Sequence, residues 1–371
     1  MNFLVDIMQT AFFIILGILG LGFLIGFHEL GHFLFCKLFR VRTPSFSIGM
    51  GPKIFTKMIG ETEFSLSAIP LGGYVEIAGL EEVGQGKQKE AKRADKLSFN
   101  QKPYYQKLLV LTGGIVFNLF FAYIAFIGLY MTGIPKVAFL FPEDQPVIIK
   151  QATPGSPAEL SGLQSGDKIK KIIYTDCNNP KTEEINNFPE FQKYLQDLKD
   201  HDISLVVERN NEQKDIKIHI TPEGTIGFEP DFGEIKFLPA QSFLESIKSG
   251  INAANSTIIK TFTAFKSIFS GKNLKGLGGP LLIISETIKS AKKGFKIFLV
   301  LLALISVNLA VLNLIPLPIL DGGQILFTTI ETVIRRQLSE KVKNFIQVAC
   351  WILIIGLMLL LTVWDVKRIF F

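Results

Sequence analysis

Four long apolar runs divide the chain, and they set the first expectation about its fold. They lie at about residues 7–36, 108–134, 297–320 and 344–364. Within these runs the only Asp, Glu, Lys or Arg is Glu29, in the first. A membrane-spanning helix needs about 20 predominantly apolar residues, so each run is long enough to cross a bilayer. The pattern predicts a polytopic α-helical membrane protein with four transmembrane helices.

Between the first two runs, residues 43–80 have a different period. Polar and apolar side chains alternate over Glu63–Ile69, which is typical of a β-strand. Pro70–Gly73 then predicts a turn, and a second strand follows from Tyr74. We expect a membrane-associated β-hairpin that lines a protein cavity, because irregular backbone at membrane depth is tolerated only against protein or water. An ordinary interfacial hairpin is the alternative.

The long segment between the second and third runs divides in two. Residues 136–236 combine short apolar stretches with turn residues, which predicts an inserted α+β domain. Residues 237–296 mix apolar side chains with Lys, Ser and Asn, which predicts amphipathic interfacial helices or a cover over the membrane part. The membrane part is then split into residues 1–135 and 297–371. Residues 324–343 are expected to form a charged link.

Composition supports this assignment. Of the chain, 48% is hydrophobic and only 19% is charged, which is typical of a membrane protein. The lipid bilayer is therefore the first expected partner. The net charge of +6 suits Lys and Arg beside anionic lipid. No compact basic domain stands out, so we expect no nucleic-acid partner.

Basic residues predict the orientation in the membrane. The loop after the first run is flanked by Lys37, Arg40, Arg42, Lys102 and Lys107. Four more basic residues lie in the link before the fourth run. The positive-inside rule places both loops in the cytoplasm, with both termini and residues 136–236 outside. Lys292, Lys293 and Lys296 oppose this orientation, but they end a long loop, where the rule is weaker.

The first run ends in a motif that carries chemistry, His28-Glu29-Leu30-Gly31-His32. Residues four apart lie on one face of a helix, so His28 and His32 can offer their imidazoles to one metal ion. Glu29 follows the first His and can take a proton from a metal-bound water. Zinc lowers the pKa of such a water from about 15.7 towards about 7. A catalytic zinc site needs a third protein ligand, which must come from elsewhere in the chain.

The end of the third run offers that ligand. Pro316 and Pro318 break the helix, and Asp321 follows before two glycines. A carboxylate at this point is the best available third ligand, although an Asp at a helix end or interface is common. Asn313 is a candidate to hydrogen-bond a substrate backbone, and interhelical glue is nearly as good an explanation.

The second run contains small and polar residues without an obvious chemical role. Gly113 and Gly114 allow close helix approach, and Asn118 can hydrogen-bond to another helix. We expect a structural role for all three.

Several motifs together resemble the site-2 protease family of intramembrane zinc metalloproteases, most of all its bacterial branch with the sigma-E regulator protease. They are FHELGH at 27–32, GMGPKIF at 49–55, PLGGYV at 70–75 and NLIPLPILDGG at 313–323. In addition, residues 152–169 resemble the signature of a PDZ domain, which binds peptides at a strand edge. The sigma-E type has two PDZ modules in tandem, whereas this chain has room for one.

The resemblance implies a cofactor and a set of site residues. The cofactor is Zn²⁺, with His28, His32 and Asp321 as ligands and Glu29 as the general base. The hairpin at 61–79 would pair with an extended substrate. The implied substrate-binding residues are Asn313, Gly72, Gly73 and Tyr74.

The implied activity is hydrolysis of peptide bonds within or near the transmembrane segments of single-span membrane proteins. Such regulated intramembrane proteolysis acts on anti-sigma factors or signal-peptide remnants. The expected location is the bacterial inner membrane. The active site would lie near the cytoplasmic side, and the substrate's periplasmic part or another peptide would meet the PDZ domain. A catalytically silent, membrane-bound PDZ adaptor is the alternative. A transporter is a weaker possibility, because the chain has four spans and no inverted repeat.

Overall fold

A computed structural model describes residues 2–80, 88, 90, 93–176, 179–231, 235–270 and 278–370. The chain forms two compact units. The first combines Met1–Thr132 with Gln241–Phe371, and the second is Gly133–Ala240. The first unit therefore joins segments from the two ends of the chain, and it contains the sequence motifs with candidate chemistry.

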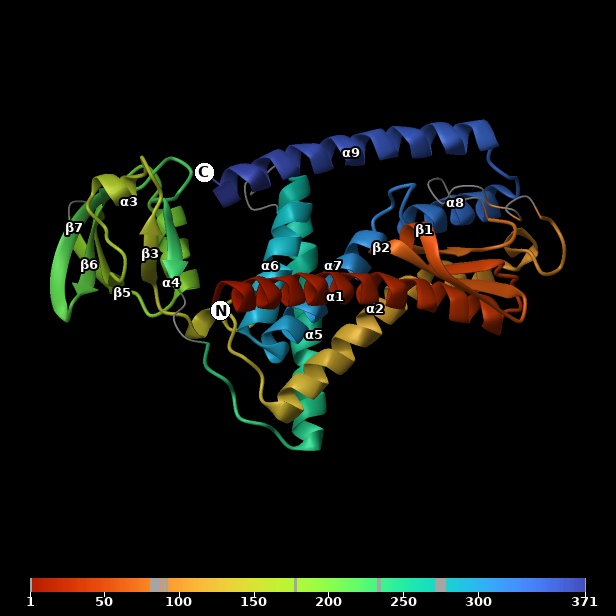
Figure 1. The fold of residues 1–371 in the computed structure, drawn as a ribbon. Coiled ribbons are helices and arrows are strands. Elements are labelled where there is room, and N and C mark those ends of the chain that lie inside the picture. The colour runs from red at the N-terminus through yellow and green to blue at the C-terminus, as the bar shows by residue number, and fades with distance from the viewer. Residues whose placement is uncertain are drawn as a thin grey trace. The chain divides into compact units, whose positions relative to one another are not determined.

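Among the described residues of the first unit, four helices are long and apolar enough to cross a membrane (Figure 1). They are α1 (Asn2–Leu38), α2 (Tyr104–Thr132), α7 (Phe295–Asn313) and α9 (Glu340–Phe370). Helices α1, α2 and α9 correspond to the first, second and fourth apolar runs, and α7 covers the first part of the third. Helix α2 packs against both α1 and α7, so it lies between the helix with the His-Glu motif and the helix with Asn313.

The helix formed by the third run is shorter than the hydropathy of the run predicts. Helix α7 ends at Asn313 rather than continuing to residue 320, and turns follow because the run contains Pro316 and Pro318. The expectation of a charged link at 324–343 is also wrong. Most of that segment belongs to helix α8 (Asp321–Ile334), so Asp321 begins a new helix rather than ending the third span.

The hairpin exists, and it is larger than the sequence predicts. Strands β1 (Ser45–Ile59) and β2 (Thr62–Glu76) are joined by a turn at residues 60–61, which was not predicted from the sequence. The chain folds back again near Pro70–Gly73, where the turn was predicted, although this segment is counted within β2. Ser47 pairs with both Ser65 and Tyr74, so the start of β1 lies between two segments of β2. This folding back brings the end of β2 to one edge of the sheet.

Aromatic packing holds this sheet against α1. The ring centroids of Phe33 and Phe46 are 5.4 Å apart, as are those of Phe33 and Phe64. Phe33 directly follows the second His of the motif. The sheet is therefore fixed beside the turn of α1 that carries the candidate chemistry. The short helix η1 (Phe99–Gln101) precedes α2.

Two amphipathic helices, α5 (Phe243–Phe269) and α6 (Pro280–Lys293), pack on the membrane helices. Thr261 of α5 donates a 2.9 Å hydrogen bond to the side chain of Asn308 in α7. The Asp365 carboxylate of α9 accepts hydrogen bonds of 2.9 Å from two backbone amides at the start of α6. This packing fits a cover over the membrane part, and an interfacial position stays a prediction.

The second unit is an α+β module with a six-stranded sheet in the order β7-β6-β4-β3-β8, with β5 paired to β4. Its strands are β3 (Ile148–Ala152), β4 (Lys168–Asp176), β5 (Asn179–Glu184), β6 (Asp202–Arg209), β7 (Glu212–His219) and β8 (Phe228–Asp231). Its helices are η2 (Pro142–Asp144), α3 (Pro157–Leu160) and α4 (Phe188–Asp197). Phe191, Ile172 and Leu205 are fully buried in its core.

A buried ion pair also stabilises the second unit. Asp167 is fully buried and accepts hydrogen bonds of 2.6 Å from Nε and Nη2 of Arg209. It also accepts one of 2.9 Å from the Gln164 backbone amide. Both carboxylate oxygens are therefore satisfied, as a buried charge requires.

Candidate metal centre

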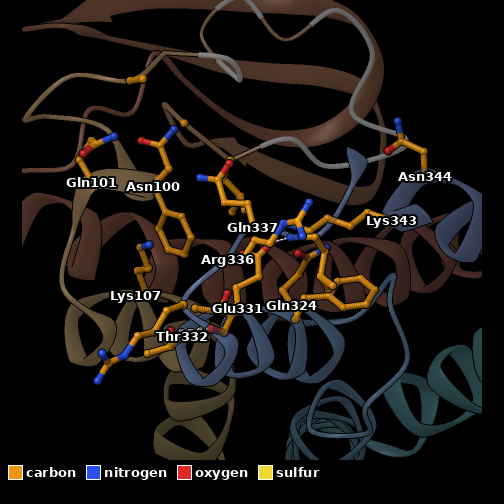
Figure 2. Close-up of a pocket in the computed structure, with 18 of the residues that line it drawn as sticks. Asn100, Gln101, Lys107, Gln324, Glu331, Thr332, Arg336, Gln337, Lys343 and Asn344 are labelled. Atoms are coloured by element: carbon orange, nitrogen blue, oxygen red, sulfur yellow. Dashed lines mark hydrogen bonds and ion pairs between the residues drawn. The ribbon is translucent and has the colours of Figure 1, made fainter. Parts of the chain in front are cut away.

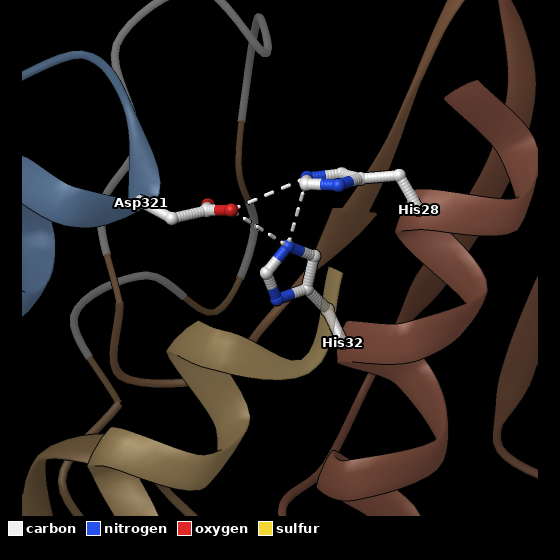
Figure 3. A group of neighbouring side chains, drawn as sticks. All are labelled: His28, His32 and Asp321. Carbon is white, nitrogen blue, oxygen red and sulfur yellow. Dashed lines mark hydrogen bonds and ion pairs between the residues drawn. The ribbon is translucent and has the colours of Figure 1, made fainter. Parts of the chain in front are cut away.

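The structure brings His28, His32 and Asp321 together, although 289 positions separate the second His from the Asp in the sequence. Figure 3 shows both imidazoles projecting from successive turns of α1, with Asp321 pointing towards them from the start of α8. Asp321 Oδ2 lies 3.3 Å from His28 Nε2 and 3.5 Å from His32 Nε2. The two Nε2 atoms are 3.2 Å apart. All three potential ligand atoms thus face one point.

Glycines on α2 make room for this cluster. A Cβ atom on Gly113 would lie 2.7 Å from the carbonyl oxygen of Gly31, so the two helix backbones are in direct contact. A Cβ atom on Gly114 would lie 2.5 Å from Nε2 of both His28 and His32. Real Cβ atoms do not approach other atoms that closely. Gly114 therefore leaves open the space beside the two nitrogens that would bind a metal.

The backbone of α2 also orients His32. The Nδ1 atom of His32 lies 2.8 Å from the Val110 carbonyl oxygen, which can only accept a hydrogen bond. Nδ1 must carry the proton in this contact, so Nε2 is left with a free lone pair. A metal-binding His is generally fixed in this way by a partner on its other nitrogen.

His28 has an equivalent partner in Asn118. The Asn118 side-chain amide lies 3.1 Å from His28 Nδ1, and both residues are buried. Asn118 Oδ1 is buried and has no hydrogen-bond partner among the described residues. The oxygen and nitrogen ends of an amide are assigned from their partners. Rotating this amide by half a turn lets Oδ1 accept the Nδ1 proton, which satisfies the buried oxygen and frees His28 Nε2.

The chemistry of these residues fits a zinc ion. Asp321 Oδ2 is buried and accepts no hydrogen bond from any described residue, yet it faces two imidazole nitrogens. A buried carboxylate oxygen without a partner is costly unless a cation or a donor satisfies it. Two His nitrogens and one carboxylate are a known set of protein ligands for catalytic zinc, and they leave a fourth position open.

Glu29 lies between this cluster and the edge of the sheet. Its carboxylate interacts electrostatically with all three cluster residues and is hydrogen-bonded to the backbone of Val75 in β2. A Cβ atom on Gly73 would lie 3.4 Å from Glu29 Cγ. The end of β2 is therefore in direct contact with the candidate base.

The other proposed substrate residues lie at different distances from the cluster. Asn313, the last residue of α7, places its amide nitrogen 3.4 Å from His28 Nε2. Gly72 adjoins Gly73 and has a φ of +110°, so its backbone conformation favours glycine. The hydroxyl of Tyr74 instead accepts a 3.5 Å hydrogen bond from Ser45 within the sheet. The structure thus brings Asn313 and Gly73 to the cluster and turns the Tyr74 side chain towards the hairpin.

Comparison with known proteins agrees with this geometry. The model of peptidase family M50 matches residues 16–357. The chain belongs to peptidase family M50, the site-2 protease family. It is 33% identical to "Putative zinc metalloprotease CPE1693" of Clostridium perfringens, and the alignment covers 95% of this chain and 98% of that protein. It is also 33% identical to "Putative zinc metalloprotease FN1322" of Fusobacterium nucleatum, over 96% of this chain and 99% of the relative.

Family M50 membership makes this protein a membrane zinc metalloprotease. The predicted activity class and the predicted cofactor are confirmed at that level. Within the described residues, the group formed by His28, His32 and Asp321 could hold the metal ion. A protease has a use for the carboxylate of Glu29, whereas a silent adaptor does not, so the enzyme is the better description.

Sequence reasoning missed the part that α2 plays in this M50 site. Asn118 and the Gly113-Gly114 pair were expected to serve helix packing alone, yet Asn118 contacts His28 and Gly114 lies against both imidazoles. The part played by the Val110 carbonyl could not be predicted from residue type, because it is a backbone group that every residue has. The one available clue was a polar Asn in an otherwise apolar run, because such residues are functional candidates in a membrane.

Proposed function

We propose that this M50 peptidase hydrolyses peptide bonds within or near the transmembrane segments of single-span membrane proteins. In this proposal His28, His32 and Asp321 hold the zinc ion, and Glu29 is the general base. The observation that carries it is the convergence of three ligand atoms and Glu29 at one end of spanning helices, beside the edge of β2. A soluble substrate would not require the site to lie among spanning helices.

The residues divide the work of hydrolysis between them. When bound, zinc polarises the scissile carbonyl and lowers the pKa of the attacking water. Glu29 takes the proton from that water and later passes it to the leaving amine nitrogen. The Val75 backbone fixes Glu29, and the α2 partners fix the two imidazoles. Asn313, whose amide nitrogen lies 3.4 Å from His28 Nε2, would hydrogen-bond a substrate backbone in this proposal.

The edge of β2 supplies a place for the substrate. A transmembrane helix hides its peptide bonds, so the segment must be extended before cleavage. Residues 73–76 pair on one side with 45–48, and no other described strand segment pairs with them. An extended peptide can add to such an edge through main-chain hydrogen bonds. A peptide held along Gly73 would run directly past Glu29, and Gly72, Gly73 and Tyr74 would supply backbone partners.

Orientation and the second unit complete the proposal. The basic loops around α1, α2 and α9 favour a cytoplasmic active site in the bacterial inner membrane, with both termini and Gly133–Ala240 outside. The second unit resembles a PDZ domain in its 152–169 signature, and its α+β sheet is compatible with one. It would bind the extracytoplasmic part of the substrate or another peptide. Anti-sigma factors and signal-peptide remnants are the expected substrate classes for regulated intramembrane proteolysis.

The test is cleavage of a co-expressed single-span substrate by the wild type and by Glu29→Gln. The substitution keeps size and polarity but removes the base, so we expect cleavage to be lost while the protein still binds zinc. Glu286→Gln is the matched control, because Glu286 is exposed on α6, outside both the hairpin and the metal cluster, and this variant should cleave as the wild type does. Equal cleavage by wild type and Glu29→Gln would refute the proposal. Membrane proteomics of the same strains should show the natural substrate accumulating in Glu29→Gln.

A further inference from the structure

A second cavity in the first unit lies along α8 and does not include the metal cluster. It has a volume of about 560 Å³. Its walls come from the segment around η1, the first turn of α2, helix α8 from Gln324 onwards, residues 335–338 after that helix, and the start of α9. Figure 2 shows Asn100, Gln101 and Lys107 on one side of this hollow and Gln324, Arg336 and Lys343 on the other.

The charge of the lining is strongly unbalanced. Among the described residues, four cationic side chains line the cavity, against the single carboxylate of Glu331. That carboxylate is already occupied, because Oε1 lies 2.5 Å from Lys343 Nζ and accepts a 2.9 Å hydrogen bond from the Leu338 backbone amide. The remaining cations are Lys107, Arg335 and Arg336. The described lining of the cavity therefore carries a net positive charge that Glu331 does not balance.

Lys107 shows this imbalance most clearly. It is half-buried, and its ammonium group lies 5.9 Å from the centre of the Phe99 ring. Glu331 attracts the Lys107 ammonium group electrostatically, but no ion pair within 4 Å joins Lys107 to a residue in the part of the chain that the structure describes. A cation that is partly removed from water is stabilised by an anion nearby. The amides of Asn100, Gln101 and Gln337 add uncharged donors to the same lining.

The position of the cavity indicates where such an anion would come from. Lys107 lies in the first turn of the candidate span Tyr104–Thr132, and Lys343 lies in the first turn of the candidate span Lys341–Val366. Two spans thus begin at this cavity, so it lies at the level where the hydrocarbon region ends. Phosphate groups of lipids lie at that level, and basic pockets between membrane helices bind anionic headgroups.

We propose that this cavity binds the phosphate group of an anionic phospholipid headgroup, with Lys107 and Arg336 as its principal cationic contacts. Binding would also hold α8 in place. The Tyr104 hydroxyl and Thr329 Oγ1 are 3.0 Å apart, so the start of α2 is already joined to α8. Helix α8 begins at Asp321, so a headgroup at its other end would steady the helix that carries this proposed ligand. That consequence rests on the proposed function, but the lipid site itself does not.

The experiment measures lipid binding on the full-length protein in detergent, and it needs no protease activity. Native mass spectrometry titrates phosphatidylglycerol and phosphatidylcholine against the wild type and the double variant Lys107→Gln, Arg336→Gln. Each basic group near a membrane surface strengthens anionic binding about five-fold, so the double variant should bind phosphatidylglycerol about thirty-fold more weakly. Its weak binding of phosphatidylcholine should not change.

Two further variants separate a specific site from general surface charge. Lys341→Gln removes a charge at the same helix end but outside the cavity lining, so it should bind phosphatidylglycerol as the wild type does. Lys107→Arg with Arg336→Lys keeps the charges and should restore binding, which excludes misfolding as the cause of a loss. The proposal is overturned if Lys341→Gln weakens binding as much as the double variant does. It is also overturned if the wild type does not prefer phosphatidylglycerol, or if millimolar inorganic phosphate displaces the lipid completely, since the site would then take soluble phosphate.

Discussion

Gly114→Ala is the most direct test of how the metal centre is built. The added Cβ would lie 2.5 Å from Nε2 of both His28 and His32, whereas ordinary contact begins at 3.4 Å. The imidazoles or the helix must therefore move by about 1 Å. Zinc–ligand distances tolerate only about 0.2 Å, and a misplacement of about 1 Å costs about a hundredfold in rate. We expect kcat/KM to fall about a hundredfold, equivalent to about 2.7 kcal/mol of transition-state stabilisation.

The assay compares zinc content and substrate cleavage in Gly114→Ala, the wild type and Gly128→Ala. Gly128 is the matched control because it lies on the same helix and a Cβ there meets no described atom within 4 Å. Ala stabilises a helix relative to Gly by about 1 kcal/mol. Neither variant should therefore unfold because of helix propensity, and Gly128→Ala should keep full zinc content and activity. Unchanged zinc content and cleavage in Gly114→Ala would refute the reasoning about the space beside the imidazoles.

Substitutions at three further positions test other parts of the structure. Asn118→Ala should weaken zinc binding about 10- to 100-fold, because it removes the partner of His28. Asn118→Asp should largely retain zinc binding, because a carboxylate also accepts the Nδ1 proton. Zinc affinity is measured by competition with a chelator, and equal affinities for the wild type and Asn118→Ala would contradict this role. Asp321→Ala should lose both bound zinc and cleavage, and retention of both would place the third ligand elsewhere. Asp167→Ala removes the buried carboxylate that pairs with the half-buried Arg209 and should destabilise the second unit by about 1.5–3 kcal/mol. Hydrogen exchange over residues 133–240 of the full chain measures this loss, and a change below about 1 kcal/mol would show that the pair contributes little.

The four spanning helices were predictable because length and apolarity are local properties. Their ends were less so. Leu314–Leu320 remains apolar, so hydropathy extended the third span, although Pro316 and Pro318 stop the helix at Asn313. In the hairpin, the fold-back near Pro70–Gly73 could be predicted because its composition is typical of a turn. The turn at residues 60–61 and the pairing of β1 were missed, because the sequence around Gly60 gives a weaker turn signal.

The candidate site could also be predicted only in part. His28 and His32 follow from helix period alone, and Asp321 could be found because the chemistry of zinc demands a third ligand. In the sequence, Asn118 and Gly114 could not be distinguished from residues that serve helix packing alone. Their contacts with the imidazoles depend on the rotation of α2 against α1, which no local pattern in one sequence specifies.

Helix α2 supplies none of the proposed ligands, yet it controls whether they can work together. It provides a carbonyl for one imidazole, an amide for the other, and an open space between them. All three contributions require that the backbones of α1 and α2 touch, which they do at Gly31 and Gly113. A larger residue at either position would separate the helices and disturb all three at once. The close packing expected of Gly113 is therefore also what holds the His-Glu motif ready for a metal ion.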